Sequence, residues 1–126
     1  MSLMILVAGP YRSGTGDDPA TIAANHRRIQ RACLELFRAG HLAVNGEDVA
    51  LPLAELAGSM RVGDAAFDEV FHPVGRRLVA RVDAVLRLPG ESAGSDEMVS
   101  LARARGIPVW TDVADVPPPA QAESSA

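Results

Sequence analysis

The segment Met4–Ala8 contains apolar residues only, has the length of a strand, and is followed at once by Gly9 and Pro10. A strand with one face in water would alternate apolar and polar side chains. A run without polar positions is instead typical of a strand that is covered on both faces, as in a parallel sheet flanked by helices. We therefore expect an α/β domain that begins with this strand.

Strand and helix patterns alternate along the rest of the chain. Apolar positions at helical spacing follow Pro19 and end at Gly40. Further strands are expected at 41–44, 83–88 and 107–110, the last toward a sheet edge because of Pro108. Helices are expected at 49–60, 64–71, 74–81 and 96–105, with Pro73 ending or restarting a helix. This alternation predicts a three-layer parallel α/β domain.

The composition limits the number of domains and the class of partner. A chain of 126 residues forms one domain; we expect it to span 1–116, followed by a disordered tail at 117–126 that is rich in Pro, Ala and Ser. The net charge is −4. A nucleic-acid surface needs clustered basic residues, so we expect no nucleic-acid partner.

The cysteine and histidine content limits the chemistry. Cys33 is the only cysteine, which excludes an internal disulfide and favours a cytoplasmic protein with Cys33 in its core. The three histidines show no metal-ligand spacing, so we expect no metal and no other cofactor. No segment approaches the roughly 20 apolar residues of a membrane span, so no membrane partner is expected.

Two glycine-rich loops follow the first and third expected strands, and both carry hydroxyl groups. The carboxyl ends of parallel strands meet at one edge of a sheet, so the loops should form two walls of one small-molecule site. Small residues let backbone N–H groups approach an anion, and an arginine offers a bidentate fork. The candidate substrate- or phosphate-binding residues are Gly9, Tyr11, Arg12, Ser13, Gly14, Ser92, Gly94 and Ser95.

Three well-known motifs are incomplete. The segment Gly9–Thr15 resembles part of a P-loop but lacks its lysine, which argues against phosphoryl transfer from a nucleoside triphosphate. No G-x-G-x-x-G follows either strand, and Ser92 has no G-x-S-x-G around it. The sequence therefore gives no support for a dinucleotide fold or a serine hydrolase.

The order of the remaining motifs resembles the nucleoside 2-deoxyribosyltransferase-like superfamily. These motifs are Gly-Pro-Tyr-Arg-Ser after the first strand, Val-Asp-Ala-Val-Leu from Val82, Ser-x-Gly from Ser92, and Gly-Ile-Pro-Val from Gly106. The chain is most similar to the small members, the nucleoside 5′-monophosphate N-glycosidases and the DUF4406-type proteins, over 4–110.

The resemblance implies a flavodoxin-like parallel sheet of four to five strands with helices on both faces, and a homodimer. It implies cleavage of the N-glycosidic bond of a nucleotide or nucleoside through a carboxylate nucleophile and a covalent sugar–enzyme intermediate, by hydrolysis or transfer. It also implies that the 5′-phosphate binds at Tyr11, Arg12, Ser13, Ser92 and Gly94.

The nucleophile position departs from the family pattern. The family has glutamate six residues after the serine, and here that position is Met98, with Glu97 one residue earlier and about 100° around the helix. Glu97 is the candidate nucleophile, with Asp68 and His72 near the place of the family's helper aspartate. Alternatively, the chain is a nucleotide-binding module without catalytic activity, or an enzyme acting on another phosphorylated metabolite.

Other readings of the acidic residues also stay open. Acidic residues at 96–97 are typical of a helix's first turn, for which Ser95 could be the N-cap. The residues Glu47, Asp48 and Glu91 follow strands at the same sheet edge, and each is an alternative carboxylate that could face the sugar or simply a solvated loop charge.

Overall fold

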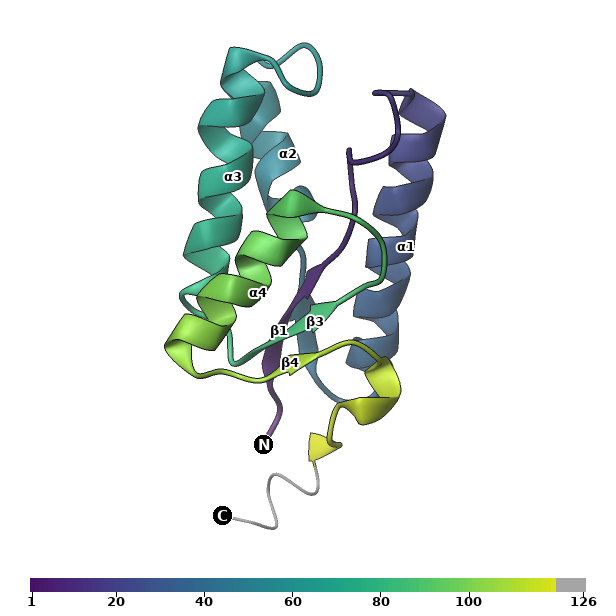
Figure 1. The fold of residues 1–126 in the computed structure, drawn as a ribbon, viewed down its shortest axis with the longest axis vertical. Helices are drawn as coiled ribbons and strands as arrows, with labels where there is room; N and C mark the ends of the chain where they lie inside the picture. Colours follow the sequence, from purple (N-terminus) through teal and green to yellow (C-terminus); the bar gives the residue numbers. More distant parts are fainter. Residues whose placement is uncertain (120–126) are drawn as a thin grey trace.

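The computed structural model describes residues 1–119. Within them a four-stranded sheet has the order β2-β1-β3-β4, with every pair parallel (Figure 1). Its strands are β1 (Met4–Ala8), β2 (Leu42–Val44), β3 (Ala84–Arg87) and β4 (Val109–Trp110). The helices are α1 (Pro19–Arg38), α2 (Gly46–Leu56), α3 (Ala65–Val79) and α4 (Ala93–Arg105), with a 3₁₀ turn, η1, at Val113–Asp115. This confirms the predicted flavodoxin-like α/β fold.

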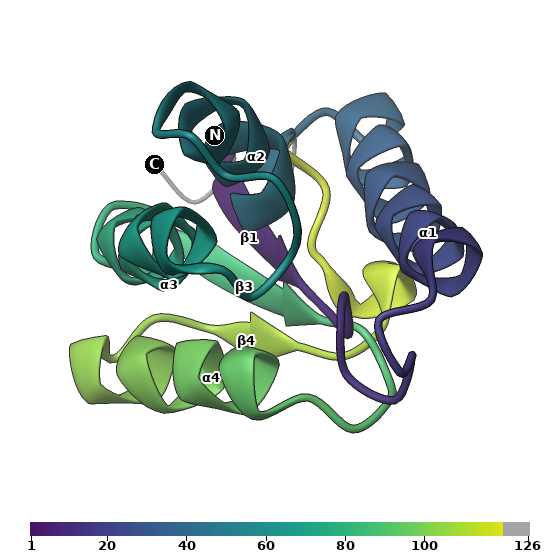
Figure 2. The same cartoon turned by 90° about the horizontal axis from the view of Figure 1, so that it is seen from above.

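Helices cover both faces of the sheet (Figure 2). On one face, Ile5 and Val7 of β1 pack with Ile29 and Leu36 of α1. On the other face, Leu6 belongs to a second cluster that includes residues of α3 and α4. Successive residues of β1 therefore enter two separate cores, which explains why the strand has no polar position.

The first helix and the last strand follow the sequence signals. Asp18 caps α1 by accepting a hydrogen bond from the Thr21 backbone N–H at 3.0 Å, and Pro19 is the first helical residue. Gly40 follows the helix with a φ of 100°, a conformation that favours glycine. The strand β4 lies at a sheet edge as predicted, and Pro108 precedes it.

Two helices begin three residues earlier than predicted because residues further upstream cap them. Asn45 caps α2 by accepting from the Asp48 backbone N–H at 2.8 Å, so α2 begins at Gly46 instead of 49. Ser92 caps α4 by accepting from the Ser95 backbone N–H at 3.1 Å, so α4 begins at Ala93 instead of 96. The predicted N-cap, Ser95, is therefore the third residue of its helix.

The predicted break at Pro73 does not occur, and α3 runs through it from Ala65 to Val79. A proline inside a helix removes a hydrogen bond and costs about 3 kcal/mol. Phe67 packs in an aromatic cluster before Pro73, and Val79 is buried against the sheet after it. Burial on both sides of the proline offsets this cost and keeps the helix continuous.

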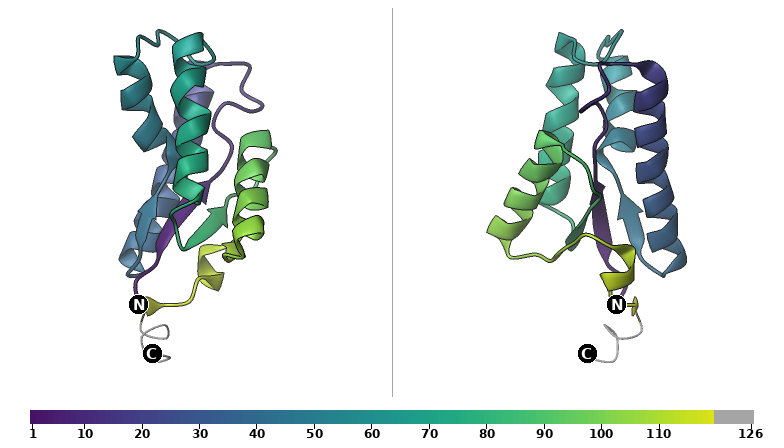
Figure 3. Two further views of the ribbon diagram at one scale, coloured as in Figure 1. Left: turned by 90° about the vertical axis from the view of Figure 1, so that its left-hand side faces the viewer. Right: turned by 45° about the vertical axis from the view of Figure 1, so that its right-hand side comes forward.

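The chain start and the segment after β4 lie together at the end of the sheet where β1 begins (Figure 3). The Leu3 backbone N–H donates to His41 Nδ1 at 3.0 Å, so Nε2 carries the proton and donates to the Pro117 carbonyl at 2.8 Å. The Pro119 carbonyl accepts from the chain's amino group at 2.8 Å. The packed chain thus extends beyond 116 to Pro119, and the rest of the predicted disordered tail, 120–126, lies outside the described residues.

Candidate functional site

A cavity of about 640 Å³ lies at the carboxyl end of β1, between its neighbours β2 and β3. In the sheet, β2 lies on one side of β1 and β3 lies on the other. The end of β1 is therefore the topological switch point, where ligands commonly bind in parallel α/β sheets. The loop after β1, the first turns of α2 and α4, and part of α3 form its walls. The two loops expected to share one site do so.

The first wall is the N-terminus of α4. Ser92 and Ser95 are buried, and the Ser92 hydroxyl bonds both the hydroxyl and the backbone N–H of Ser95. Among residues 1–119, the N–H groups of Ala93 and Gly94 have no acceptor. Both residues line the cavity, and a Cβ at Gly94 would meet no atom within 4 Å. This wall can bind an anion through backbone N–H groups and the positive end of the helix dipole.

The second wall is the loop after β1. Gly9, Ser13 and Arg12 line the cavity, whereas the predicted Gly14 does not. Arg12 is already paired with a carboxylate, because its Nε and Nη2 donate to Asp17 at 2.6 and 2.9 Å. The hydrogen bond to Asp17 raises the pKa of Arg12. A phosphate would reach this guanidinium only by sharing it with Asp17 or displacing Asp17.

Aromatic rings form a third part of the cavity. Phe71 stacks on Phe67 with a centroid distance of 4.5 Å and on Tyr11 with a distance of 5.5 Å. Tyr11 also meets His26 edge to face at 5.8 Å. Burial, with a smaller contribution from the Glu47 charge, raises the pKa of the Tyr11 hydroxyl. The edges of these rings give a planar base an apolar wall to pack against. No sequence motif singles out the two phenylalanines.

Glu97 lines the cavity and forms an ion pair with α3. Arg76 Nε donates to Glu97 Oε1 at 2.6 Å, and this hydrogen bond lowers the pKa of the glutamate. Its side chain remains 41% exposed. Because α4 begins at Ala93, Glu97 is the fifth helical residue and lies beyond the first turn. An acidic residue in the first turn would be explained by the helix dipole, but Glu97 is not in that turn.

Met98, at the family's glutamate position, also lines the cavity. It packs against the apolar cluster between the sheet and helices α3 and α4. Its sulfur would lie 3.3 Å from a Cβ built at Gly75, so the absence of a side chain at Gly75 leaves space for it. Met98 therefore contributes both to the core and to the cavity surface.

Of the two other predicted catalytic residues, His72 lines the cavity and Asp68 does not. His72 lines the cavity and packs edge to face on Phe71 at 5.4 Å. Asp68 is exposed and is not part of the cavity lining. Its charge is a minor contribution to the raised pKa of Arg12, after that of the Asp17 hydrogen bond.

No family model matches this chain, and no curated protein matches it. The resemblance to nucleoside 2-deoxyribosyltransferase-like proteins therefore rests on the sequence motifs alone. Within residues 1–119, no group of three or more His, Cys, Asp or Glu side chains could hold a metal ion. No helix in the same residues is long and apolar enough to cross a membrane.

Glu47 is an acidic residue for which the sequence left two readings open, a carboxylate that could face the sugar or a solvated loop charge. It belongs to the first turn of α2, is 8% exposed and lines the cavity, so it is not a solvated loop charge. Burial raises the pKa of its carboxyl to about 7. The exposed Glu91 is absent from the cavity lining. The sequence signal that indicates a place for Glu47 in the cavity is its position directly after β2, at the same sheet edge as the two loops.

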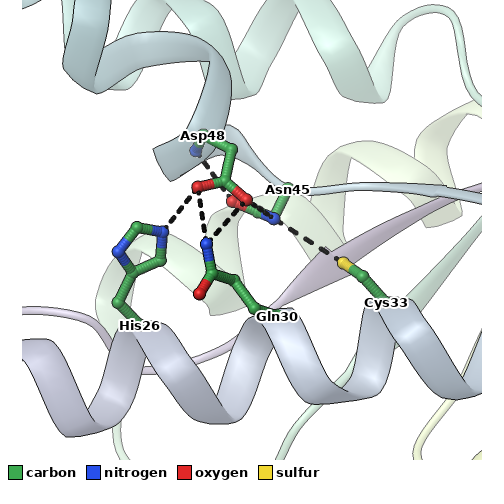
Figure 4. Close-up of polar contacts among 5 residues, drawn as sticks. All are labelled: His26, Gln30, Cys33, Asn45 and Asp48. Carbon is green, nitrogen blue, oxygen red and sulfur yellow. Dashed lines mark hydrogen bonds and ion pairs between the residues drawn. The ribbon is translucent and has the colours of Figure 1, made fainter.

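Asp48 faces α1 instead and joins the two helices (Figure 4). Its carboxylate contacts His26 Nε2 at 2.7 Å and accepts from the side-chain amides of Gln30 at 3.1 Å and Asn45 at 2.8 Å. Asn45 also lies 3.6 Å from the sulfur of Cys33, which is partly buried against the core. Adjacent helical residues point about 100° apart, so this network fixes the orientation of the turn that carries Glu47.

Proposed function

We propose that this protein cleaves the N-glycosidic bond of a nucleotide or nucleoside, with Glu97 as the nucleophile. One observation carries the proposal: a single cavity is lined by an anion-binding helix N-terminus, stacked aromatic rings and the ionised Glu97. A nucleoside monophosphate offers the matching three groups, which are a phosphate, a planar base and a sugar between them. The motif resemblance points to the same substrate class.

The binding mode follows from the walls of the cavity. The free N–H groups of Ala93 and Gly94 would hold the 5′-phosphate. Ser13 lines the same cavity as a further phosphate contact, and Arg12 would join it by sharing its guanidinium with Asp17 or releasing Asp17. The base would pack against the edges of the Tyr11 and Phe71 rings, whose faces already stack on each other. This arrangement leaves the sugar beside Glu97, and the reaction calls for no cofactor.

The proposed reaction is that of a retaining glycosidase. A Glu97 carboxylate oxygen attacks the anomeric carbon, the bond to the base breaks, and a covalent sugar–enzyme ester forms. Water then attacks the same carbon and releases the sugar; a second base in place of water gives transfer. Arg76 supports this role because its hydrogen bond keeps Glu97 ionised.

The alternative is a nucleotide-binding module without activity, and the position of Met98 favours it. A thioether in the cavity, where the family has a carboxylate, cannot attack the sugar and be restored by hydrolysis. Such a module would be stabilised by nucleoside monophosphates without consuming them, because ligands that bind only the native state raise its melting temperature.

The deciding experiment incubates the parent protein with a panel of ribo- and deoxyribonucleosides and their 5′-monophosphates and measures free base by chromatography. We expect base release by the parent and a loss of about 100-fold or more in Glu97→Gln. Asp96→Asn is the matched control, because Asp96 pairs with Arg87 at 2.8 Å and does not line the cavity; this variant should keep the parent rate.

The other outcomes separate the two functions. Nucleotides that raise the melting temperature of an inactive parent would support the binding module and reject the glycosidase. Base release that appears only in Met98→Glu would show that the parent lost the nucleophile. A parent with neither base release nor a thermal shift across the panel would reject both functions.

We also propose that the protein forms a homodimer through the side of the molecule where α1, β2 and α2 meet. β2 is an edge strand, and α1 and α2 are joined by the Asp48 network beside it. Large apolar side chains of these elements are exposed, and an apolar surface of this kind is typical of an interface between subunits. The exposed residues are Leu34, Phe37, Leu42, Val49, Leu53 and Leu56.

A further inference from the structure

Glu47 is an acidic side chain in the cavity that the reaction described above does not use. Only 8% of it is exposed, and it lines the cavity. A buried carboxyl group is costly unless it is hydrogen bonded, paired or protonated. Its own backbone N–H donates a hydrogen bond to this carboxyl and favours the charged form. No other residue among 1–119 donates to it, and the structure pairs it with no cation.

The surrounding groups leave the Glu47 carboxyl without a direct countercharge. His26 of α1 favours the charged form, but its ring is bound to Asp48 at 2.7 Å. Asp48 itself disfavours a second negative charge nearby. The pKa values of Tyr11 and Cys33 are raised, so both side chains are neutral where Glu47 titrates and provide no countercharge. Burial is the largest effect and raises the pKa of Glu47 to about 7.

Glu47 and Glu97 belong to different walls of the cavity. Glu47 follows β2 and Glu97 lies in the helix after β3, while β1 separates these two strands. Neighbouring strands are about 4.8 Å apart, so the strands that precede the two glutamates are separated by about 10 Å. Both glutamates line the same cavity, which has room for a sugar and the first atoms of its base.

We propose that Glu47 is the general acid that protonates the departing base in the proposed glycosidase reaction. The inference rests on that proposed function. As the C1′–N bond breaks, its electron pair stays on the base, and the Glu47 proton moves to a base nitrogen or to the oxygen conjugated with it. Glu97 forms the C1′–O bond in the same step. The attacking water later gives one proton back to the Glu47 carboxylate, and both carboxyl groups regain their starting states.

The test separates proton donation from a structural role by changing the leaving group. Glu47→Gln keeps the shape of the side chain but cannot donate a carboxylic proton. With 2′-deoxyguanosine 5′-monophosphate, we expect base release to fall by about 100-fold or more. With the 7-methyl derivative, whose cationic base leaves as a neutral molecule without protonation, we expect a fall of less than about 10-fold. Glu55→Gln is the control, because Glu55 is exposed on the same helix.

The pH dependence gives a second readout. The parent rate on the unmethylated nucleotide should decline above a pH of about 7, where Glu47 loses its proton. The Glu47→Gln rate should lack this decline, and Glu55→Gln should retain it. Circular dichroism at each pH establishes that the variants are folded.

The possible failures are distinguishable. A parent that releases base, together with an equally fast Glu47→Gln, overturns the acid role and leaves the glycosidase in place. Equal losses on the methylated and unmethylated nucleotides also overturn the acid role, because they indicate a structural effect. A parent that releases base from neither of these nucleotides nor from any member of the panel described above overturns the proposed function, and this inference with it.

Discussion

Two glutamates of the cavity have pKa values displaced in opposite directions, for different physical reasons. The Arg76 hydrogen bond lowers the pKa of Glu97, and burial raises that of Glu47 to about 7. Environments that shift the pKa values of two carboxyl groups in opposite directions are typical of sites that need one protonated and one ionised carboxyl group at the same pH. At the residue scale, the pKa of each glutamate is therefore set by its local contacts more than by its residue type.

The displaced pKa of Glu47 predicts how stability changes with pH. The pKa of Glu47 is 4.5 ordinarily and about 7 in the folded protein. Between these two pH values the folded protein keeps a proton that the unfolded chain has lost. This contribution to the free energy of unfolding is fully present below a pH of about 4.5. It is lost as the pH rises to about 7, by about 3 kcal/mol at most.

Glu47→Gln removes this titration. Relative to the parent, we expect the variant to gain stability between a pH of about 4.5 and a pH of about 8, measured by urea denaturation at both. Glu55→Gln should follow the parent at both pH values. A difference in unfolding free energy between parent and Glu47→Gln that stays constant with pH would contradict the assignment.

At the scale of elements, the strands were more predictable than the helix starts. An apolar run such as Met4–Ala8 carries its own signal, because both faces of a central parallel strand are buried. A helix start depends on which of several capping residues is used. Ser92 and Ser95 have the same capping chemistry, so local sequence does not distinguish them, and the structure uses Ser92.

Asn45 is the clearest test of an element start, because it is 3% exposed and its side chain makes three hydrogen bonds. Its oxygen caps α2 and its amide donates to the Asp48 carboxylate, both at 2.8 Å, and to the Cys33 sulfur at 3.6 Å. Asn45→Ala removes all three contacts and should lower the free energy of unfolding by about 2 kcal/mol. Asn45→Ser keeps a capping oxygen and should lose about half as much. Equal losses in urea denaturation would show that the cap contributes nothing.

At the scale of the whole molecule, only part of the site could be predicted. The loop after β1 and the start of α4 share a cavity because parallel strands bring their carboxyl ends to one edge, and that rule can be applied to a sequence. The aromatic side of the cavity depends on how α3 packs over the sheet end. Nothing in the periodicity of 64–79 indicates that Phe67 and Phe71 turn toward the same space as Tyr11.

The proposed homodimer is a prediction about the whole molecule, because its exposed apolar surface is formed by three elements, α1, β2 and α2. A twofold axis through this surface would bring each apolar side chain near its counterpart or a neighbour on the second copy. Leu53 on α2 is 47% exposed and should become buried there.

Leu53→Asp would bury an unpaired carboxylate in each copy, a cost large enough to separate the subunits. By light scattering after size-exclusion chromatography, we expect the parent at twice the 13.2 kDa mass of the chain and Leu53→Asp at that mass. Ser100→Asp adds the same charge to an exposed position of α4, away from this surface, and should remain dimeric. A parent that elutes as a monomer, or a Leu53→Asp variant that stays dimeric, would rule out this interface.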